Sequence, residues 1–241
     1  MVESILASLD VSLAAITALG IAMITLVLAL LSRRARKASL RPIDAYETIR
    51  QAPTRAVESD LPMHISLGSG GLGSEATPES AAALGAARFL AEGGAAATAR
   101  TMITAGDGTL AVGAMGLPDA DALYAGSDPM AYAAGAAAMA RASDTSAQIL
   151  FGDFGDEGLW LAGALCAGRR TPVGGTAEPS SAALMYAVLD EALVGEEVYA
   201  AGAYLGEESQ VASLVALDVL RWLGILALVV GTLAVSFGWW R

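Results

Sequence analysis

The most strongly apolar segments of the chain lie near its two ends. Residues 11–31 contain no charged side chain, and residues 222–240 form a second apolar run with tryptophan at both ends. An α-helix rises about 1.5 Å per residue, so roughly 20 apolar residues cross the hydrocarbon core of a bilayer. Both segments are therefore predicted to be transmembrane helices, which makes the lipid bilayer the first expected partner.

The charges that follow the first segment predict its orientation. Arg33, Arg34, Arg36 and Lys37 come directly after the apolar run, whereas a cleaved signal peptide carries its basic residues before that run. Basic clusters beside a membrane helix favour the cytoplasmic side. We therefore expect an uncleaved anchor in the cytoplasmic membrane, with the central part of the chain in the cytoplasm.

Between the two ends, short apolar runs of β-forming residues alternate with longer alanine-rich stretches. The predicted strands are 63–67, 101–105, 122–125, 148–151, 172–174 and 192–194, and the predicted helices are 78–93, 108–116, 129–142, 157–168, 180–190 and 196–206. Consecutive parallel strands require crossover connections, which helices supply. The sequence thus predicts a Rossmann-like α/β fold, with a parallel sheet of about six strands and helices on both faces.

These elements divide the chain into six parts. The predicted parts are a short non-cytoplasmic N-terminus at 1–10, a transmembrane helix at 11–32, a basic and amphipathic connector at 33–61, a cytoplasmic α/β domain at 62–206, a helical connector at 207–221 and a second transmembrane helix at 222–240. Within the first connector, Pro53 is predicted to interrupt a short helix and Pro62 to end it, because proline lacks the backbone N–H that a helix needs.

Both predicted membrane helices carry small residues at alternating spacings of three and four. The first stripe contains Ala15, Ala18, Ala22, Thr25 and Ala29, and the second contains Gly224, Ala227, Gly231, Ala234 and Gly238. Small residues let helix backbones approach closely in lipid. This pattern favours close helix packing, within one chain or between chains, although an alanine-rich chain also produces such stripes by chance.

Composition limits the chemistry of the central domain. The net charge is −11, and residues 62–205 account for it with sixteen acidic residues against five arginines. Nucleic acid is therefore not an expected partner, because phosphate binding needs a basic surface. The single cysteine, Cys166, excludes an internal disulfide. The single histidine, His64, falls in a predicted strand, where a core histidine is favoured over a general base.

The loops after the predicted strands combine glycine with carboxylates. In a parallel sheet these loops meet at one edge, where ligands bind. The candidate ligand-binding residues are Gly68, Ser69, Gly70, Gly71, Gly73, Glu75, Thr176 and Glu178. Three of the glycines spell G-x-G-x-x-G, the dinucleotide fingerprint, yet the next helix begins late, at Thr77-Pro78, and no acid follows at the usual distance of about 20 residues. A tight turn or a self-association loop is the alternative.

Acidic side chains at the same edge suggest a cation. Asp107, Asp153, Asp156 and Glu157 are candidate ligands for a divalent metal ion, because Mg²⁺ and Ca²⁺ take oxygen ligands. Carboxylates that complement helix N-termini are the alternative for Asp156 and Glu157. No cofactor is established beyond this candidate cation, and no catalytic residue is predicted.

Several motifs resemble a known family. Residues 64–73, 75–77, 103–107, 131–135, 152–157 and 202–205 are similar to the bacterial family called domain of unknown function 6754. The resemblance spans roughly residue 41 to the second apolar segment. It implies the architecture and the membrane anchoring, and it implies no catalytic residue.

Two functional hypotheses from different classes follow. The first is a membrane-anchored α/β protein that self-associates, as a homo-oligomer, and serves as a scaffold or assembly component. The second is a membrane-anchored sensory or ligand-binding domain that uses the glycine and acid edge for a divalent cation or a small polar ligand, with a nucleotide less favoured. An enzyme acting through the same edge ranks third, because the sequence contains no recognisable reactive constellation.

Overall fold

The computed structural model describes residues 40–168 and 172–206, followed by 210–211, 214, 221–225, 228–229, 231–233 and 236. The chain divides into two compact units, of which one is Arg41–Gly206. The other unit holds both predicted membrane segments. The first segment, with Ala15, Ala18, Ala22, Thr25 and Ala29, lies outside the described residues, as do Ala227, Ala234 and Gly238 of the second.

Parts of the second apolar segment are described. Gly224 and Gly231 are helical, and a Cβ added at either would meet no atom within 4 Å. Within the described portion of the chain, no helix is both long enough and apolar enough to cross a membrane.

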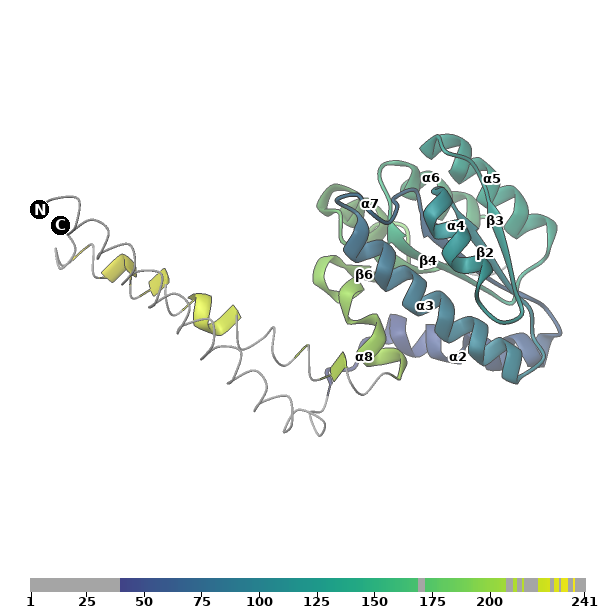
Figure 1. The fold of residues 1–241 in the computed structure, drawn as a ribbon, viewed down its shortest axis with the longest axis horizontal. Coiled ribbons are helices and arrows are strands. Elements are labelled where there is room, and N and C mark those ends of the chain that lie inside the picture. The colour runs from purple at the N-terminus through teal and green to yellow at the C-terminus, as the bar shows by residue number, and fades with distance from the viewer. Residues whose placement is uncertain are drawn as a thin grey trace, which may run out of the picture. The chain divides into compact units, whose positions relative to one another are not determined.

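The unit Arg41–Gly206 contains a parallel sheet of six strands among its described residues (Figure 1). The strands are β1 (Met63–Gly68), β2 (Thr101–Ala105), β3 (Ala120–Tyr124), β4 (Ala147–Asp153), β5 (Val173–Thr176) and β6 (Glu191–Val194). Their order in the sheet is β3-β2-β1-β4-β5-β6, and every neighbouring pair is parallel. The predicted α/β fold with a six-stranded parallel sheet is therefore confirmed, and the order is that of a Rossmann-like fold.

Helices connect the strands. They are α2 (Asp44–Ser59), α3 (Thr77–Ala96), α4 (Gly108–Met115), α5 (Pro129–Ala142), α6 (Glu157–Cys166), α7 (Pro179–Tyr186), the 3₁₀ helix η1 (Gly195–Ala200) and α8 (Ala201–Leu205). Helices α2, α3 and α4 pack on one another over one face of the sheet, and α5, α6 and α7 form the layer on the opposite face (Figure 1). Covering both faces with helices explains why every residue of β1, β2 and β5 is buried.

Local sequence explains where several helices begin. Proline occupies the first turn of α3, α5 and α7, where its missing N–H would have no partner in any case. Asp107 and Asp128 cap α4 and α5, because their side chains accept hydrogen bonds from backbone N–H groups of the first turn.

One expectation about the connector was wrong. Helix α2 continues through Pro53 to Ser59, and it belongs to the same compact unit as the sheet. Ile49, Ala52 and Ala56 on this helix are buried, and the ring of Pro53 lies so close to Gly93 of α3 that a Cβ there would overlap it. Burial of this face against α3 offsets the hydrogen bond that proline cannot make.

The two ends of the unit are tied together. The phenol of Tyr204 on α8 donates to the carbonyl of Arg41 at 2.7 Å, and the rings of Tyr204 and Tyr46 stack with centroids 4.6 Å apart. Tyr46 in turn donates to the carbonyl of Glu197 at 2.5 Å, while Arg41 pairs with the Glu197 carboxylate. The first and last residues of the unit are therefore adjacent, and α2 is joined to η1 and α8.

Candidate functional site

The candidate site lies at the carboxyl ends of β1 and β4, where the connections of the sheet change direction. From β1 the chain passes through α3 to β2, and from β4 it passes through α6 to β5 on the other side. The two loops therefore diverge, which creates the position where open α/β sheets bind ligands. Gly68 of β1 and Asp153 of β4 stand in register at this point.

The glycine-rich loop after β1 lies directly on two of the predicted metal ligands. A Cβ added at Gly70 would overlap the Asp153 carboxylate, and a Cβ added at Gly71 would overlap the Asp107 carboxylate. Gly68 and Gly73 adopt the left-handed backbone, with φ of +88° and +92°. Glycine at these positions thus permits a close approach of the loop to the carboxylates of Asp107 and Asp153.

The remaining candidate ligand-binding residues lie around this loop. Glu75 is exposed, and Ser69 donates from its hydroxyl to Glu157 at 2.5 Å. Thr176 accepts from the backbone N–H groups of Phe154 and Glu178, each at 3.3 Å. The Thr176 hydroxyl therefore joins the loops after β4 and β5.

The four predicted metal ligands have different surroundings. Asp107 caps α4, and the hydroxyl and N–H of Thr109 lower its pKa. Asp156 is exposed at the start of α6, whereas Glu157 is buried and accepts from the Gly155 N–H at 2.9 Å. Within the ranges that the structure describes, no group of three or more histidine, cysteine, aspartate or glutamate side chains is placed to hold a metal ion.

Sequence reasoning did not single out Glu79, which completes this site. Glu79 sits in the first turn of α3, is only 5% exposed, and hydrogen-bonds with the Asp153 side chain. Burial and the negative charge of Asp153 raise the pKa of Glu79 to about 7. Burial likewise raises the pKa of Asp153, and the charges of Glu157 and Glu178 add to that effect. The two carboxyls therefore form a pair that resists full ionisation.

The Glu79 side chain has one oxygen without a hydrogen-bond partner. Its Oε2 atom is buried and accepts no hydrogen bond, while the backbone N–H of Ala177 bonds to the same carboxyl. Tyr199 of η1 also reaches this carboxyl, and burial together with Glu79 raises the pKa of its phenol. The pair itself comes from α3 and β4, and the loop after β5 and the helix η1 supply its further neighbours, Ala177 and Tyr199.

A polar network lies below the site, on the α5 face of the sheet. The Tyr132 hydroxyl bonds to Ser66 and accepts from the Gly68 N–H at 2.9 Å, and burial raises its pKa. His64 Nε2 lies 3.0 Å from Thr104 Oγ1, and burial lowers the His64 pKa to about 4. His64 is therefore a neutral, fully buried core residue, as the sequence suggested, although its Nδ1 atom has no partner.

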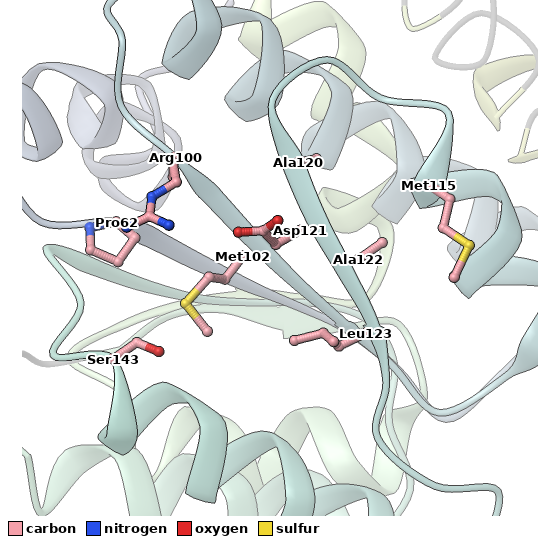
Figure 2. A pocket seen from close by; sticks show the side chains of 9 residues that line it. All are labelled: Pro62, Arg100, Met102, Met115, Ala120, Asp121, Ala122, Leu123 and Ser143. Atoms are coloured by element: carbon pink, nitrogen blue, oxygen red, sulfur yellow. The ribbon is translucent and has the colours of Figure 1, made fainter.

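A second feature lies at the β3 edge of the sheet. An open groove of about 640 Å³ has Met102, Leu123 and Met115 among its lining residues. Figure 2 shows the side chains that line it. Met115 and Leu123 of this lining are exposed by 62% and 40%. Val112 on α4 and Tyr124 on β3 are two more exposed hydrophobic side chains of these elements, exposed by 70% and 52%. We call these four residues and strand β3 the β3 edge.

Comparison with known proteins gives one match. The family described as domain of unknown function 6754 matches residues 5–240 of the chain. Neither the curated proteins nor the solved structures contain a match.

Proposed function

Since the chain belongs to the family of domain of unknown function 6754, we propose on physical grounds that it is a membrane-anchored scaffold whose copies assemble through the β3 edge. The observation that carries the proposal is an apolar, unprotected sheet edge. In the described part of the chain, β3 ends the sheet, and the backbone groups on its outer side have no strand partner.

Proteins normally protect such an edge. Lysine, proline, a bulge or a covering helix usually prevents a sheet edge from pairing with another chain. Strand β3 has neither lysine nor proline, and its one charged residue is Asp121. Apolar patches of this kind on a domain surface mark interaction sites. The arrangement therefore favours a second copy as the partner, because two β3 strands can pair about a two-fold axis.

The sequence adds support from the ends of the chain. The two small-residue stripes favour close helix packing in lipid, and the basic cluster at 33–37 favours a cytoplasmic domain. A chain that associates both in the bilayer and through a sheet edge has two contacts of different geometry. Two such contacts build larger assemblies than either contact alone, as a scaffold requires.

Native mass spectrometry of the full-length protein in mild detergent tests this proposal. Tyr124→Lys places a charge on the β3 edge, and Tyr186→Lys makes the same change on α7, where the tyrosine is 67% exposed. We expect the wild type and Tyr186→Lys to be oligomeric, and Tyr124→Lys to shift to smaller species. A monomeric wild type would contradict the proposal, as would equal oligomers in both variants.

Cysteine cross-linking provides a second test. In a Cys166→Ala background, Asp121→Cys places a single thiol on β3. Ala122→Cys and Leu123→Cys are prepared beside it, because in strands that pair about a two-fold axis only the residue at the axis faces its own copy. Oxidation in membranes is expected to yield a covalent dimer for the variant at that position. Glu92→Cys, on an exposed position of α3, serves as the control that stays monomeric under the same oxidation.

A further inference from the structure

We propose that Glu79 and Asp153 form a binding site for a hard divalent cation of the Mg²⁺ class at the divergence of β1 and β4. This site is independent of the scaffold function, because it lies at the carboxyl ends of the central strands and uses no residue of the β3 edge. Neither the family match nor the sequence pattern assigns a role to Glu79.

The first argument is an unsatisfied buried oxygen. Glu79 is 5% exposed, and its Oε2 atom has no hydrogen-bond partner. A buried carboxylate oxygen without a partner costs free energy, so structures normally supply one. Here the neighbouring group is a second carboxyl, that of Asp153, which cannot donate when ionised. A cation between the two carboxyls would supply the partner that Glu79 Oε2 lacks.

The second argument is the sign of the surrounding charge. The charged side chains that act on Glu79 are Asp153 and Glu178, and those that act on Asp153 include Glu157 and Glu178. All of them are negative. A divalent cation between the two carboxyls relieves this repulsion.

The third argument identifies the class of cation. Mg²⁺ is commonly held by one or two carboxylates and keeps several of its waters, whereas Ca²⁺ takes six to eight protein and water oxygens. The structure brings together a pair of carboxyls, and no larger set of metal-binding side chains forms among the described residues. A pair suits a partly hydrated Mg²⁺ ion better than Ca²⁺ or Zn²⁺, for which sites supply more protein ligands.

Calorimetric titration of the full-length protein with MgCl₂ tests the proposal. In EDTA-treated protein at pH 7.5, we expect saturable binding to the wild type with release of protons, measured by repeating the titration in buffers of different ionisation enthalpy. Glu79→Gln and Asp153→Asn are expected to weaken Mg²⁺ binding at least tenfold. The control is Glu92→Gln on the same helix, where Glu92 pairs with Arg88 at the surface; it is expected to bind like the wild type.

Further measurements separate the outcomes. Bound Mn²⁺, observed by electron paramagnetic resonance, should be displaced by Mg²⁺ in the wild type and should not bind to Asp153→Asn. The circular dichroism of each variant verifies that it is folded, and at least one of the two site variants must be folded for the comparison. If neither Mg²⁺ nor Mn²⁺ binds to the wild type, the proposal is overturned, and the two carboxyls share a proton only. Equal binding to Glu79→Gln and Glu92→Gln also overturns it.

Discussion

Replacing Glu79 with glutamine should change how stability depends on pH. The surroundings raise the pKa of Glu79 from 4.5 to about 7 in the folded protein. An acid with a raised pKa binds more protons when folded than when unfolded between these two values, so stability falls as the pH rises through this window. The contribution of Glu79 to the free energy of unfolding is fully present below pH 4.5 and is lost as the pH rises through 7.

The magnitude follows from the size of the shift. One pKa unit corresponds to about 1.4 kcal/mol, so a shift from 4.5 to about 7 gives an upper limit of about 3–4 kcal/mol. Asp153, the partner, is only partly buried, and solvent screening reduces the value to about 1–2 kcal/mol. For a chain of this size, 1 kcal/mol changes the melting temperature by about 2–4 °C. The wild type should therefore lose about 2–8 °C between pH 4.5 and 7.5 through this group.

Differential scanning fluorimetry in metal-free buffer measures this effect. Glutamine cannot ionise, so the Glu79→Gln curve should lack this part of the decline and lie above the wild-type curve at pH 7.5. Replacing Glu79 also changes the titration of its partner Asp153, whereas carboxyls away from this pair titrate equally in both proteins and cancel in the difference. Glu92→Gln removes an exposed glutamate of the same helix and should follow the wild type. Parallel curves for Glu79→Gln and the wild type would refute the reasoning.

Two further predictions concern the loop and the network around the site. Gly71→Ala should lower the free energy of unfolding by about 1–3 kcal/mol in thermal unfolding, because the new Cβ overlaps the Asp107 carboxylate. Gly85→Ala, at an open position of α3, is the control and should raise it by about 0.5–1 kcal/mol. An unchanged stability of Gly71→Ala would show that the loop moves to accept the Cβ. Tyr132→Phe removes the hydroxyl that bonds Ser66 and the Gly68 N–H and should cost about 1–3 kcal/mol in the same assay; an unchanged melting temperature would mean that water replaces the hydroxyl.

Local patterns predicted most of the α/β unit. The apolar runs located all six strands, and Pro78, Pro129 and Pro179 mark the beginnings of α3, α5 and α7. The observed strand limits differ from the predicted ones where pairing extends a strand beyond its apolar run. Strand β3 begins at Ala120, before its apolar run, because it pairs in register with Thr101–Ala105. Register is a property of two strands, and a single segment does not encode it.

The site was harder to predict than the fold. Gly70 and Gly71 suggested a loop that holds a ligand, yet their neighbours in the structure are Asp153 and Asp107 of the same chain. By its position alone, Glu79 is an acidic residue in the first turn of α3, where a carboxylate complements the helix dipole. Its importance comes from burial beside Asp153, which lies far away in the sequence. Only the folded arrangement brings these two carboxyls together.

The clasp between Tyr46, Tyr204 and Arg41 makes the α/β unit modular. A domain whose first and last residues are neighbours can be placed inside another polypeptide without stretching its host, because the host chain leaves and returns at one point. The same stacked tyrosines also mean that pulling on both ends of the unit strains this clasp before it strains the sheet. Mechanical load on the two ends of this unit would therefore be met first by the stacked rings, the hydrogen bonds of the two tyrosines and the Arg41–Glu197 ion pair.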